Sequence, residues 1–540
     1  MHEAKLAVAS SARRSGRRFL WSRLKQAMSP LSAGLLPEAR TSRLRLGSSF
    51  ANLHIMPLTD PLQNPADNPN DPLAKGLLAA ACLLGALVFV RLGDWSLWID
   101  EAFALSDSLF RWTKSNPLGY MLFEAYFNLL GAADGVRPDE LTMRLLPAIL
   151  GWLGIPLTYW AFRPAVGRRV AAGAALILAA SAWHLYWSQN ARFYTLVQDL
   201  VLIASGLALR GFWTNRAILV SAGLIGFGVA SLAHPTAALV GGGLFVAPFL
   251  VSLFKVSMPG MSGPPRKALL AFGIVGAVGF LLWAPQVWEA WNGDDAKGQG
   301  NPVHLVLTLG FFITPVLGVA ALFGIYQSWR NKNVFGLFAA NVVFASVATA
   351  MIASIFARVS AQYLFGVLPW IAVLAALPLG WKVKSGERAP ASQVRMAFGI
   401  LAIVVFSGVT REVLYLTVRM GERPQWREAY RYVWNNRGPG DHVFGMAGPV
   451  AEYYLEPRKL EVRDVRAVTY LNKFNASEAG HWDRVDRASW FVFNAEELFD
   501  WPAEDRREFN EMLREDCRHV KSWPLFVESR DLSVEVYVRD

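Results

Sequence analysis

The chain has 540 residues, of which 53% are hydrophobic and 18% charged, and its formal net charge is +11. A soluble domain carries roughly 25% charged residues, so this composition predicts a membrane protein. Cys82 and Cys517 are the only cysteines, which excludes a disulfide framework and the Cys/His spacing of a zinc site.

The first 55 residues are strongly basic. They hold ten Lys or Arg and two Glu, and so contribute eight of the eleven net charges. A basic arm can bind nucleic acid, but no folded basic face accompanies it, and we expect no nucleic-acid partner. Three interpretations stay open: a disordered cytosolic tail, an over-extended gene start with true initiation at Met56, and a mitochondrial transit peptide. Residues 60–72, rich in Pro, Asn and Asp, form a linker, so 1–73 is expected to be tail and linker.

A transmembrane domain is expected over residues 74–418. About 20 apolar residues are needed to cross a bilayer, and eleven such spans are predicted: 74–93, 142–162, 170–188, 193–213, 217–234, 236–255, 268–288, 304–328, 334–357, 361–381 and 396–418. With the N-terminus in the cytoplasm, inside loops hold fourteen Lys or Arg and outside turns six, as the positive-inside rule requires. An odd number of spans then places the C-terminus outside.

An acidic pair, Asp100 and Glu101, follows the first span. It lies after a Trp-rich approach, Trp95 to Trp98, and opens an amphipathic segment in the outside loop 94–141. Carboxylates at a membrane surface are costly without a role, and Trp prefers the interfacial zone. The pair therefore indicates an enzyme that works on a membrane-borne substrate, although a solvated loop start would look similar.

The same loop and the C-terminal region contain further predicted elements. In the loop, the apolar spacing over 103–112 and 118–130 predicts helices that lie in the membrane interface. From residue 419 the composition becomes soluble. Helices at 425–436 and 503–515, and strands at 442–447, 489–494 and 533–538, predict a small α/β domain over 419–540.

Other polar residues fall on the predicted outside face. Arg192 suits a phosphate, because its planar guanidinium bonds two oxygens at once; the alternatives are snorkelling or pairing with Asp199 on the same helix face. His184 and His234 are interpreted first as satisfied interfacial histidines and second as ligand-binding residues. Arg358 and Gln362 form another outward-facing polar cluster at the start of a late span.

Four segments resemble bacterial GT-C glycosyltransferases of the family 39 type, the group that contains protein O-mannosyltransferases and the lipid A aminoarabinose transferase. They are Ser96–Phe103, Met143–Ala148, Tyr186–Tyr194 and Tyr363–Pro369. The resemblance covers about residues 77–380, and Trp426, Pro439-Gly440-Asp441 and Tyr453-Tyr454 in the tail are similar to common positions of relatives. The chain departs from the family pattern at Ser115–Tyr120, at Asn190 and at Gln362.

The resemblance implies a polyprenyl-phosphate sugar donor, a glycolipid, polysaccharide or protein acceptor, and a bacterial inner membrane with the C-terminal domain in the periplasm. It implies an inverting transfer in which Asp100 is the base and Glu101 supports it by position or by binding a metal. Asp100 and Glu101 are both expected as candidate ligands of a divalent metal such as Mg²⁺ or Mn²⁺. The expected donor-phosphate contacts are Arg192, Lys114 and Arg358. The expected substrate contacts are Tyr194, Tyr120, His184, His234 and Gln362.

Two other classes remain open. A transporter or flippase would carry charge in mid-span, for which Asp199 and Glu412 are the candidates, together with broken helices and internal repeats. A non-catalytic assembly protein would explain the departures in the first loop. The sequence does not identify the sugar or the acceptor.

Overall fold

The computed structural model describes residues 70–110, 116–131, 137–292, 300–357, 359–380, 390–462, 468–471, 488–499, 501–528 and 530–540. The chain divides into two units, Met1–Asp60 and Pro61–Asp540, and every described residue belongs to the second. The predicted basic tail therefore lies outside the described residues.

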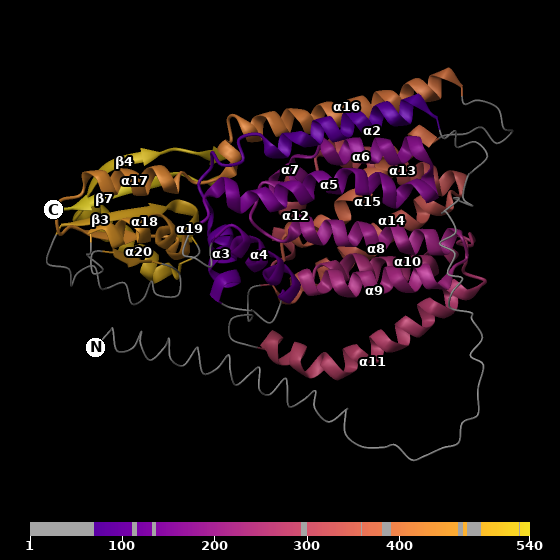
Figure 1. The fold of residues 1–540 in the computed structure, drawn as a ribbon, viewed down its shortest axis with the longest axis horizontal. Coiled ribbons are helices and arrows are strands. Elements are labelled where there is room, and N and C mark those ends of the chain that lie inside the picture. Colours follow the sequence, from indigo (N-terminus) through magenta and orange to yellow (C-terminus); the bar gives the residue numbers. More distant parts are fainter. Residues whose placement is uncertain are drawn as a thin grey trace, which may run out of the picture. The chain divides into compact units, whose positions relative to one another are not determined.

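Each of the eleven predicted spans coincides with one helix or with two or three consecutive helical segments (Figure 1). In chain order these are α2 (Pro72–Gly85) with η2 (Ala86–Phe89), α5 (Glu140–Val166), α6 (Arg168–Ala179) with α7 (Ala182–Ser188), α8 (Tyr194–Trp213), α9 (Ala217–Ala233), α10 (Ala237–Ser252), α11 (Pro264–Asn292), α12 (Pro302–Phe312) with α13 (Pro315–Asn331), α14 (Val334–Phe356), η4 (Ala361–Val367) with α15 (Leu368–Ala376) and η5 (Leu377–Gly380), and α16 (Ala391–Leu416).

Fewer than eleven of these segments are long and apolar enough to cross a membrane by themselves. Within the described residues six qualify, or eight if each of two bent pairs counts as one span, while α9 and α10 are shorter apolar helices. The bent pairs show that two of the predicted spans, 170–188 and 304–328, are broken into two helices each. The α6–α7 pair bends by 64° where the backbone of Ser181 is extended, and α12–α13 bends by 95°. At the second bend Thr314 accepts a hydrogen bond from the Leu317 amide and Pro315 follows it, which is how a new helix begins.

The helices pack closely because small residues line their contacts. A Cβ on Gly206 of α8 would meet the Trp160 ring of α5, and one on Gly223 of α9 would meet the Ala204 carbonyl of α8. Such small residues let the backbones of membrane helices approach each other. As a result α8 packs against both α5 and α9, and α2 and α16 both pack against α6.

The first outside loop forms α3 (Ile99–Phe110) and α4 (Pro117–Leu129), near the predicted helices. They were expected in the membrane interface. The structure packs α3 against α4 and against α18 (Gly448–Val462) of the C-terminal domain. Ala102 belongs to the core of that domain, and Leu105 shares an apolar cluster with Tyr453. The loop is therefore held between the helical bundle and the C-terminal domain.

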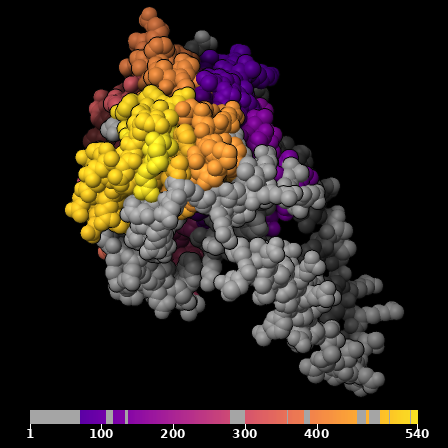
Figure 2. All heavy atoms as spheres, turned by 90° about the vertical axis from the view of Figure 1, so that its left-hand side faces the viewer, coloured from indigo at the N-terminus to yellow at the C-terminus, as the bar shows by residue number. Residues whose placement is uncertain are grey.

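The C-terminal domain contains a five-stranded mixed sheet in the order β2-β1-β3-β7-β4. Its strands are β1 (His442–Gly445), β2 (Val468–Tyr470), β3 (Ser489–Asn494), β4 (Arg518–Trp523) and β7 (Val534–Arg539). The β1 strand is parallel to β2 and β3, and β7 is antiparallel to β3 and β4. The helices of the domain are α17 (Trp426–Asn436), α18, α19 (Ala495–Phe499) and α20 (Ala503–Glu515), and a short hairpin joins β5 (Phe526–Val527) to β6 (Arg530–Asp531). Figure 2 looks onto this end, where C-terminal residues (orange and yellow) face the viewer.

These observations confirm the fold class: a polytopic α-helical membrane protein with a small C-terminal α/β domain. The predicted strands at 442–447, 489–494 and 533–538 correspond to β1, β3 and β7, and both predicted helices are present. The sequence analysis missed β2, β4 and α18.

Candidate active site

Glu101 is anchored at the N-terminus of α3. It is three residues past Trp98, and its Oε2 accepts a hydrogen bond from the Trp98 amide at 3.2 Å, as the glutamate of a capping box does. Asp100 lies in the same first turn. Negative charge is favourable there because the helix dipole leaves partial positive charge at the N-terminus.

Arg144 of α5 holds Glu101 in a bidentate ion pair that is fully buried. Its Nε donates to Oε1 and its Nη2 to Oε2, both at 2.8 Å, and neither side chain is exposed. The remaining guanidinium donors reach the carbonyl oxygens of Leu92, Trp95 and Ser96. All five N–H groups of Arg144 are thus used to fasten the approach to α3 onto the bundle.

Two further groups surround the Glu101 carboxylate. The Ala191 amide donates to Oε1 at 3.0 Å, and Nε of Arg423 lies 3.5 Å from Oε2. Burial opposes ionisation of Glu101, but Arg144, then Arg423 and the Ala191 amide, outweigh it and lower the pKa of this carboxyl. The ionised Glu101 carboxylate therefore links α3 to α5, to the turn before α8 and to the start of the C-terminal domain.

The expected metal role does not fit Glu101. Both carboxylate oxygens already accept hydrogen bonds from amides and face guanidinium groups, whose charge repels a cation. In the part of the chain that the structure describes, no group of three His, Cys, Asp or Glu comes together to hold a metal. We derive no step through a metal ion.

The C-terminal domain also fastens the first loop directly. The Tyr454 hydroxyl donates to Glu140 at 2.9 Å and accepts a hydrogen bond from the Leu97 amide at 2.8 Å. The Arg427 amide donates to the Ser96 hydroxyl at 3.0 Å, and that hydroxyl donates to Glu428 at 3.2 Å. Two helices of this domain, α17 and α18, therefore set the position of the acidic pair.

Asp100 differs from Glu101 in the contacts of its carboxylate. It is half-buried, and no hydrogen bond to its carboxylate is found within the described residues. Its backbone carbonyl accepts a hydrogen bond from Nη1 of Arg192 at 3.2 Å. A carboxylate that is held by its backbone and leaves its oxygens unused is able to take a proton from a ligand.

Arg192 lies close to several of the other predicted site residues. Burial works against its charge, but Asp100, Tyr194 and Tyr120 raise the pKa of the guanidinium, and Tyr120 is hydrogen-bonded to it. Its Nε is buried without a hydrogen-bond partner in the described structure. Buried polar atoms are normally paired, so a donor left over beside a carboxylate marks a place for an acceptor from a ligand.

Aromatic side chains surround this guanidinium. The Tyr194 ring lies 5.3 Å from the His234 ring, and His234 stacks on Tyr363 at 6.0 Å. The Tyr120 ring contacts Phe193 edge-on at 4.7 Å. Four of the other predicted site residues, Asp100, Tyr120, Tyr194 and His234, are thus brought to Arg192 from four different elements.

The other predicted contacts are placed differently. His184 is 1% exposed, its Nε2 lies 3.0 Å from the Gly151 carbonyl of α5, and its ring stacks on Phe365. These contacts give no support to a substrate role, because its helix face meets α5. Gln362 lies beside Tyr363 in η4. Lys114 and Arg358 lie outside the described residues.

Asp199 is not the partner of Arg192. It is 5% exposed, and one of its oxygens lies so near Gly154 of α5 that a Cβ there would come within 2.9 Å of it. That oxygen, Oδ1, has no hydrogen-bond partner among the described groups. The alternative in which Asp199 neutralises Arg192 is therefore wrong, since Asp199 faces α5 while Arg192 reaches α3.

Two arginines of this site were missed as site residues. Arg144 lies in a segment that resembles the family motif, but no role was assigned to it. Its charge inside an apolar span was the available signal, since such a charge needs a buried partner. Arg423 follows the last span, and its sequence context, Glu422-Arg423-Pro424, gives no sign that it reaches back to Glu101.

No protein-family model matches the sequence, and no curated protein matches it. Among solved structures, the chain is similar to ArnT from Cupriavidus metallidurans bound to undecaprenyl phosphate, with a TM-score of 0.49 and 15% identity over 86% of this chain and 97% of that one. It is similar to the oligosaccharyltransferase of Archaeoglobus fulgidus tethered to an acceptor peptide, with a TM-score of 0.48 and 13% identity over 79% of this chain and 70% of that one. It is also similar to AglB of the same organism in complex with an inhibitory peptide and a dolichol-phosphate, with a TM-score of 0.48 and 12% identity over 78% of this chain and 70% of that one.

ArnT, a lipid A aminoarabinose transferase, belongs to the group that the sequence motifs resemble. With TM-scores below 0.5, these likenesses carry no argument about substrate or mechanism. Both are argued below from the chain's own residues.

Proposed function

We propose that this protein is a membrane glycosyltransferase that moves a sugar from a polyprenyl-phosphate donor to an acceptor hydroxyl. The observation that carries the proposal is the junction of Asp100 and Arg192. A half-buried carboxylate with unused oxygens lies beside a buried guanidinium with an unused Nε, at the end of a bundle of apolar helices. One group suits proton removal and the other suits a phosphate.

The reaction needs few groups because a lipid phosphate is already a good leaving group. The acceptor oxygen forms a bond to the anomeric carbon, and the bond from that carbon to the phosphate oxygen breaks. The hydroxyl proton passes to Asp100, and the polyprenyl phosphate leaves with its negative charge opposite Arg192. A single displacement of this kind inverts the anomeric carbon.

The lipid part of the donor is inferred from the sequence resemblance and from the place of the site. In this chain Tyr120, Tyr194 and His234 lie near Arg192, and Tyr363 stacks on His234, so these rings supply flat surfaces that suit a sugar ring.

The direct test is turnover of purified protein in detergent with labelled polyprenyl-phosphate sugars and a membrane extract as the source of acceptor. We expect release of free polyprenyl phosphate together with transfer of the label, and neither with the Asp100→Asn variant. Movement of intact donor across proteoliposome membranes, without cleavage, would instead establish the transporter class. If the donor is neither cleaved nor moved across the membrane, the result favours the assembly-protein class.

Replacing Arg192 by lysine should weaken donor binding although the charge is kept. Lysine cannot bond two phosphate oxygens in the fixed geometry of a guanidinium. A charge-assisted hydrogen bond contributes about 1.5–3 kcal/mol, so we expect a loss of about tenfold or more in affinity for the donor lipid. The measurement is the dissociation constant of a labelled polyprenyl-phosphate sugar.

Arg216→Lys is the matched control, because Arg216 is exposed before α9, at the other end of α8. It should leave donor affinity unchanged. If Arg192→Lys also binds the donor as the wild type does, Arg192 serves only to hold the Asp100 carbonyl, and the phosphate role is wrong.

We further propose that the site and the C-terminal domain face the periplasm, with the N-terminus in the cytoplasm of a bacterial inner membrane. The proposal rests on the fourteen-to-six distribution of basic residues between loops. Alkaline phosphatase fused at Asp540 should be active, and green fluorescent protein fused there should be dark. The reverse pattern would mean that a span is miscounted; a fusion after Asp94 then shows whether Asp100 itself is on the other side.

A further inference from the structure

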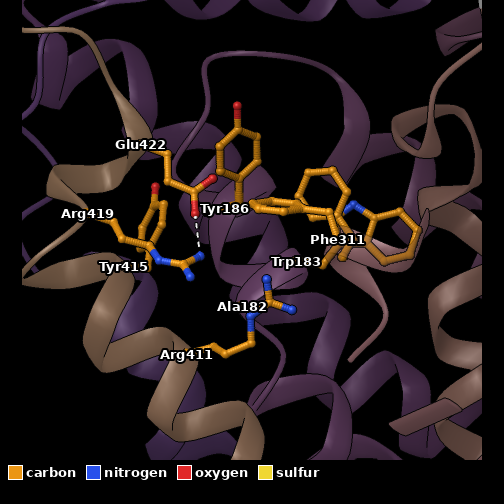
Figure 3. A pocket seen from close by; sticks show the side chains of 9 residues that line it. Ala182, Trp183, Tyr186, Phe311, Arg411, Tyr415, Arg419 and Glu422 are labelled. Carbon is orange, nitrogen blue, oxygen red and sulfur yellow. Dashed lines mark hydrogen bonds and ion pairs between the residues drawn. The ribbon is translucent and has the colours of Figure 1, made fainter. Parts of the chain in front are cut away.

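A second polar site lies where α16 leaves the bundle (Figure 3). It is a small surface hollow whose charged lining consists of Arg411, Arg419 and Glu422. We call it the arginine pocket. Arg411 lies near the C-terminal end of α16 and Arg419 lies just beyond that end, which places both guanidinium groups near one membrane surface.

The two arginines are only partly neutralised. Arg419 pairs with Glu422 at 3.2 Å, and its Nη2 lies 3.3 Å from Oε1 of Glu528. Arg411 forms one ion pair in the described structure, with the same Glu528 oxygen, at 3.8 Å. One carboxylate oxygen therefore stands between two guanidinium groups, as an oxygen of a bound anion would.

Glu528 itself is easily displaced from this position. It lies at the turn of the β5–β6 hairpin, its side chain is 47% exposed, and its backbone has a positive φ of 56°. Exposed ion pairs stabilise a protein by only about 0–1 kcal/mol. A ligand with more charge than a carboxylate can therefore replace Glu528 at little cost.

An unpartnered buried group also lines the pocket. Tyr415 is 2% exposed, and its hydroxyl has no hydrogen-bond partner among the described residues. Arg411 and Tyr415 are four residues apart on α16 and so lie on one face of that helix, and Arg419, beyond the end of α16, lines the same pocket. Together they offer two guanidinium groups and one hydroxyl to an oxygen-rich anion.

The remaining walls are apolar and aromatic. Phe312 stacks on Trp183 at 5.3 Å, and the Arg411 guanidinium lies over the Phe311 ring. Val413 of α16 and Val418, just beyond the end of that helix, are exposed to the surroundings of the bundle, 50% and 72%. A ligand that combines an anionic head with an apolar chain would satisfy both kinds of surface.

We propose that the arginine pocket binds the phosphate group of a membrane lipid, and that Glu528 occupies the two arginines until the lipid displaces it. This site is separate from Asp100 and Arg192, and the proposal does not depend on the proposed transferase activity. The recognised group is the phosphate, which a lipid phosphate monoester and inorganic phosphate have in common. Only the lipid also carries an apolar chain.

The pocket adjoins the network that holds the acidic pair. Tyr186 lines it, and the Arg423 guanidinium lies 4.6 Å from the Tyr186 ring on one side and 3.5 Å from Glu101 on the other. A lipid in the pocket would therefore be two side chains away from Glu101.

The test is the affinity of the full-length protein in detergent for dioctanoyl phosphatidic acid, measured by native mass spectrometry. Dioctanoylglycerol, which lacks the phosphate, and inorganic phosphate, which lacks the chains, are measured in parallel. We expect the phosphatidic acid to bind at least tenfold more tightly than either. Equal binding of dioctanoylglycerol would overturn the phosphate as the recognised group, and equal binding of inorganic phosphate would overturn the lipid.

Variants place the binding in this pocket. Arg411→Gln and Arg419→Gln should each weaken phosphatidic acid binding about tenfold or more, since each removes a charge-assisted contact. Arg395→Gln, at the exposed opposite end of α16, is the matched control and should bind as the wild type does. Wild-type affinity in both pocket variants would contradict the proposal.

Glu528→Gln distinguishes the mechanism from damage to the fold. It removes the competing carboxylate from an exposed side chain, so we expect affinity to rise several-fold. Unchanged or weaker binding would show that Glu528 does not compete with the lipid. All binding measurements are repeated with Asp100→Asn, in which the pocket is intact, so a failure of the transferase proposal leaves this result readable.

Discussion

Replacement of Asp100 by asparagine is expected to lower transfer by about 10²- to 10⁴-fold, the usual cost of removing a general base. Asparagine has nearly the same volume but cannot accept a proton from the acceptor hydroxyl. The Arg192 bond to residue 100 is unaffected, because it uses the backbone carbonyl. The measurement is the rate of label transfer from a polyprenyl-phosphate sugar.

The control for this variant is Asp94→Asn. Asp94 lies in the same loop, and its side chain is 51% exposed in a pair with Arg91. Exposed pairs contribute little to stability, so this variant should keep its activity. Both proteins should express and unfold like the wild type. Transfer by Asp100→Asn within about threefold of the wild-type rate would rule out Asp100 as the base.

Glu101→Gln, one residue further along, should instead destabilise the protein. Breaking a buried ion pair by removing one partner costs about 3–5 kcal/mol, because the other charge is left buried without compensation. Here the abandoned charges are Arg144, which is fully buried, and Arg423. We expect a clear fall in the midpoint of thermal unfolding in detergent and a lower yield of folded protein.

A surface acid gives the comparison. Glu511, 55% exposed in an i, i+4 pair with Arg507, should tolerate replacement by glutamine with almost no change in the unfolding midpoint. The double variant Glu101→Leu/Arg144→Leu should be less destabilised than the sum of its single variants, since it leaves neither charge alone. If the Glu101→Gln protein is as stable as the wild type, the stabilising role that we infer for the buried ion pairs of Glu101 is wrong.

Much of the fold follows from local sequence. The lengths of the apolar runs located a helical segment for each of the eleven predicted spans, because the bilayer requires about 20 apolar residues per crossing. Alternating and continuous apolar runs located β1, β3 and β7. The bends at Ser181 and Thr314 were missed, since Pro and Ser also occur within straight membrane helices and only packing shows which of them ends a helix.

The site was predicted in part. The sequence singled out Asp100, Arg192, Tyr120, Tyr194 and His234, each as a polar or aromatic residue near one membrane surface, and the structure brings these five together. It also singled out His184, which faces α5, and it overlooked Arg423 and the arginine pocket. A residue's distance from the membrane surface can be read from the sequence, whereas the direction of its side chain depends on which helices are its neighbours.

The acidic pair shows the difference between what the sequence indicates and what only the tertiary structure decides. The sequence by itself determined that two carboxylates stand at a membrane surface at the start of a helix, in a chain that crosses the membrane many times. It could not divide their roles, because adjacent residues are alike in composition and depth. Only the tertiary structure did so: successive residues of a helix point about 100° apart, so Glu101 meets Arg144, Ala191 and Arg423 from distant parts of the chain while Asp100 keeps its carboxylate free of hydrogen bonds within the described structure.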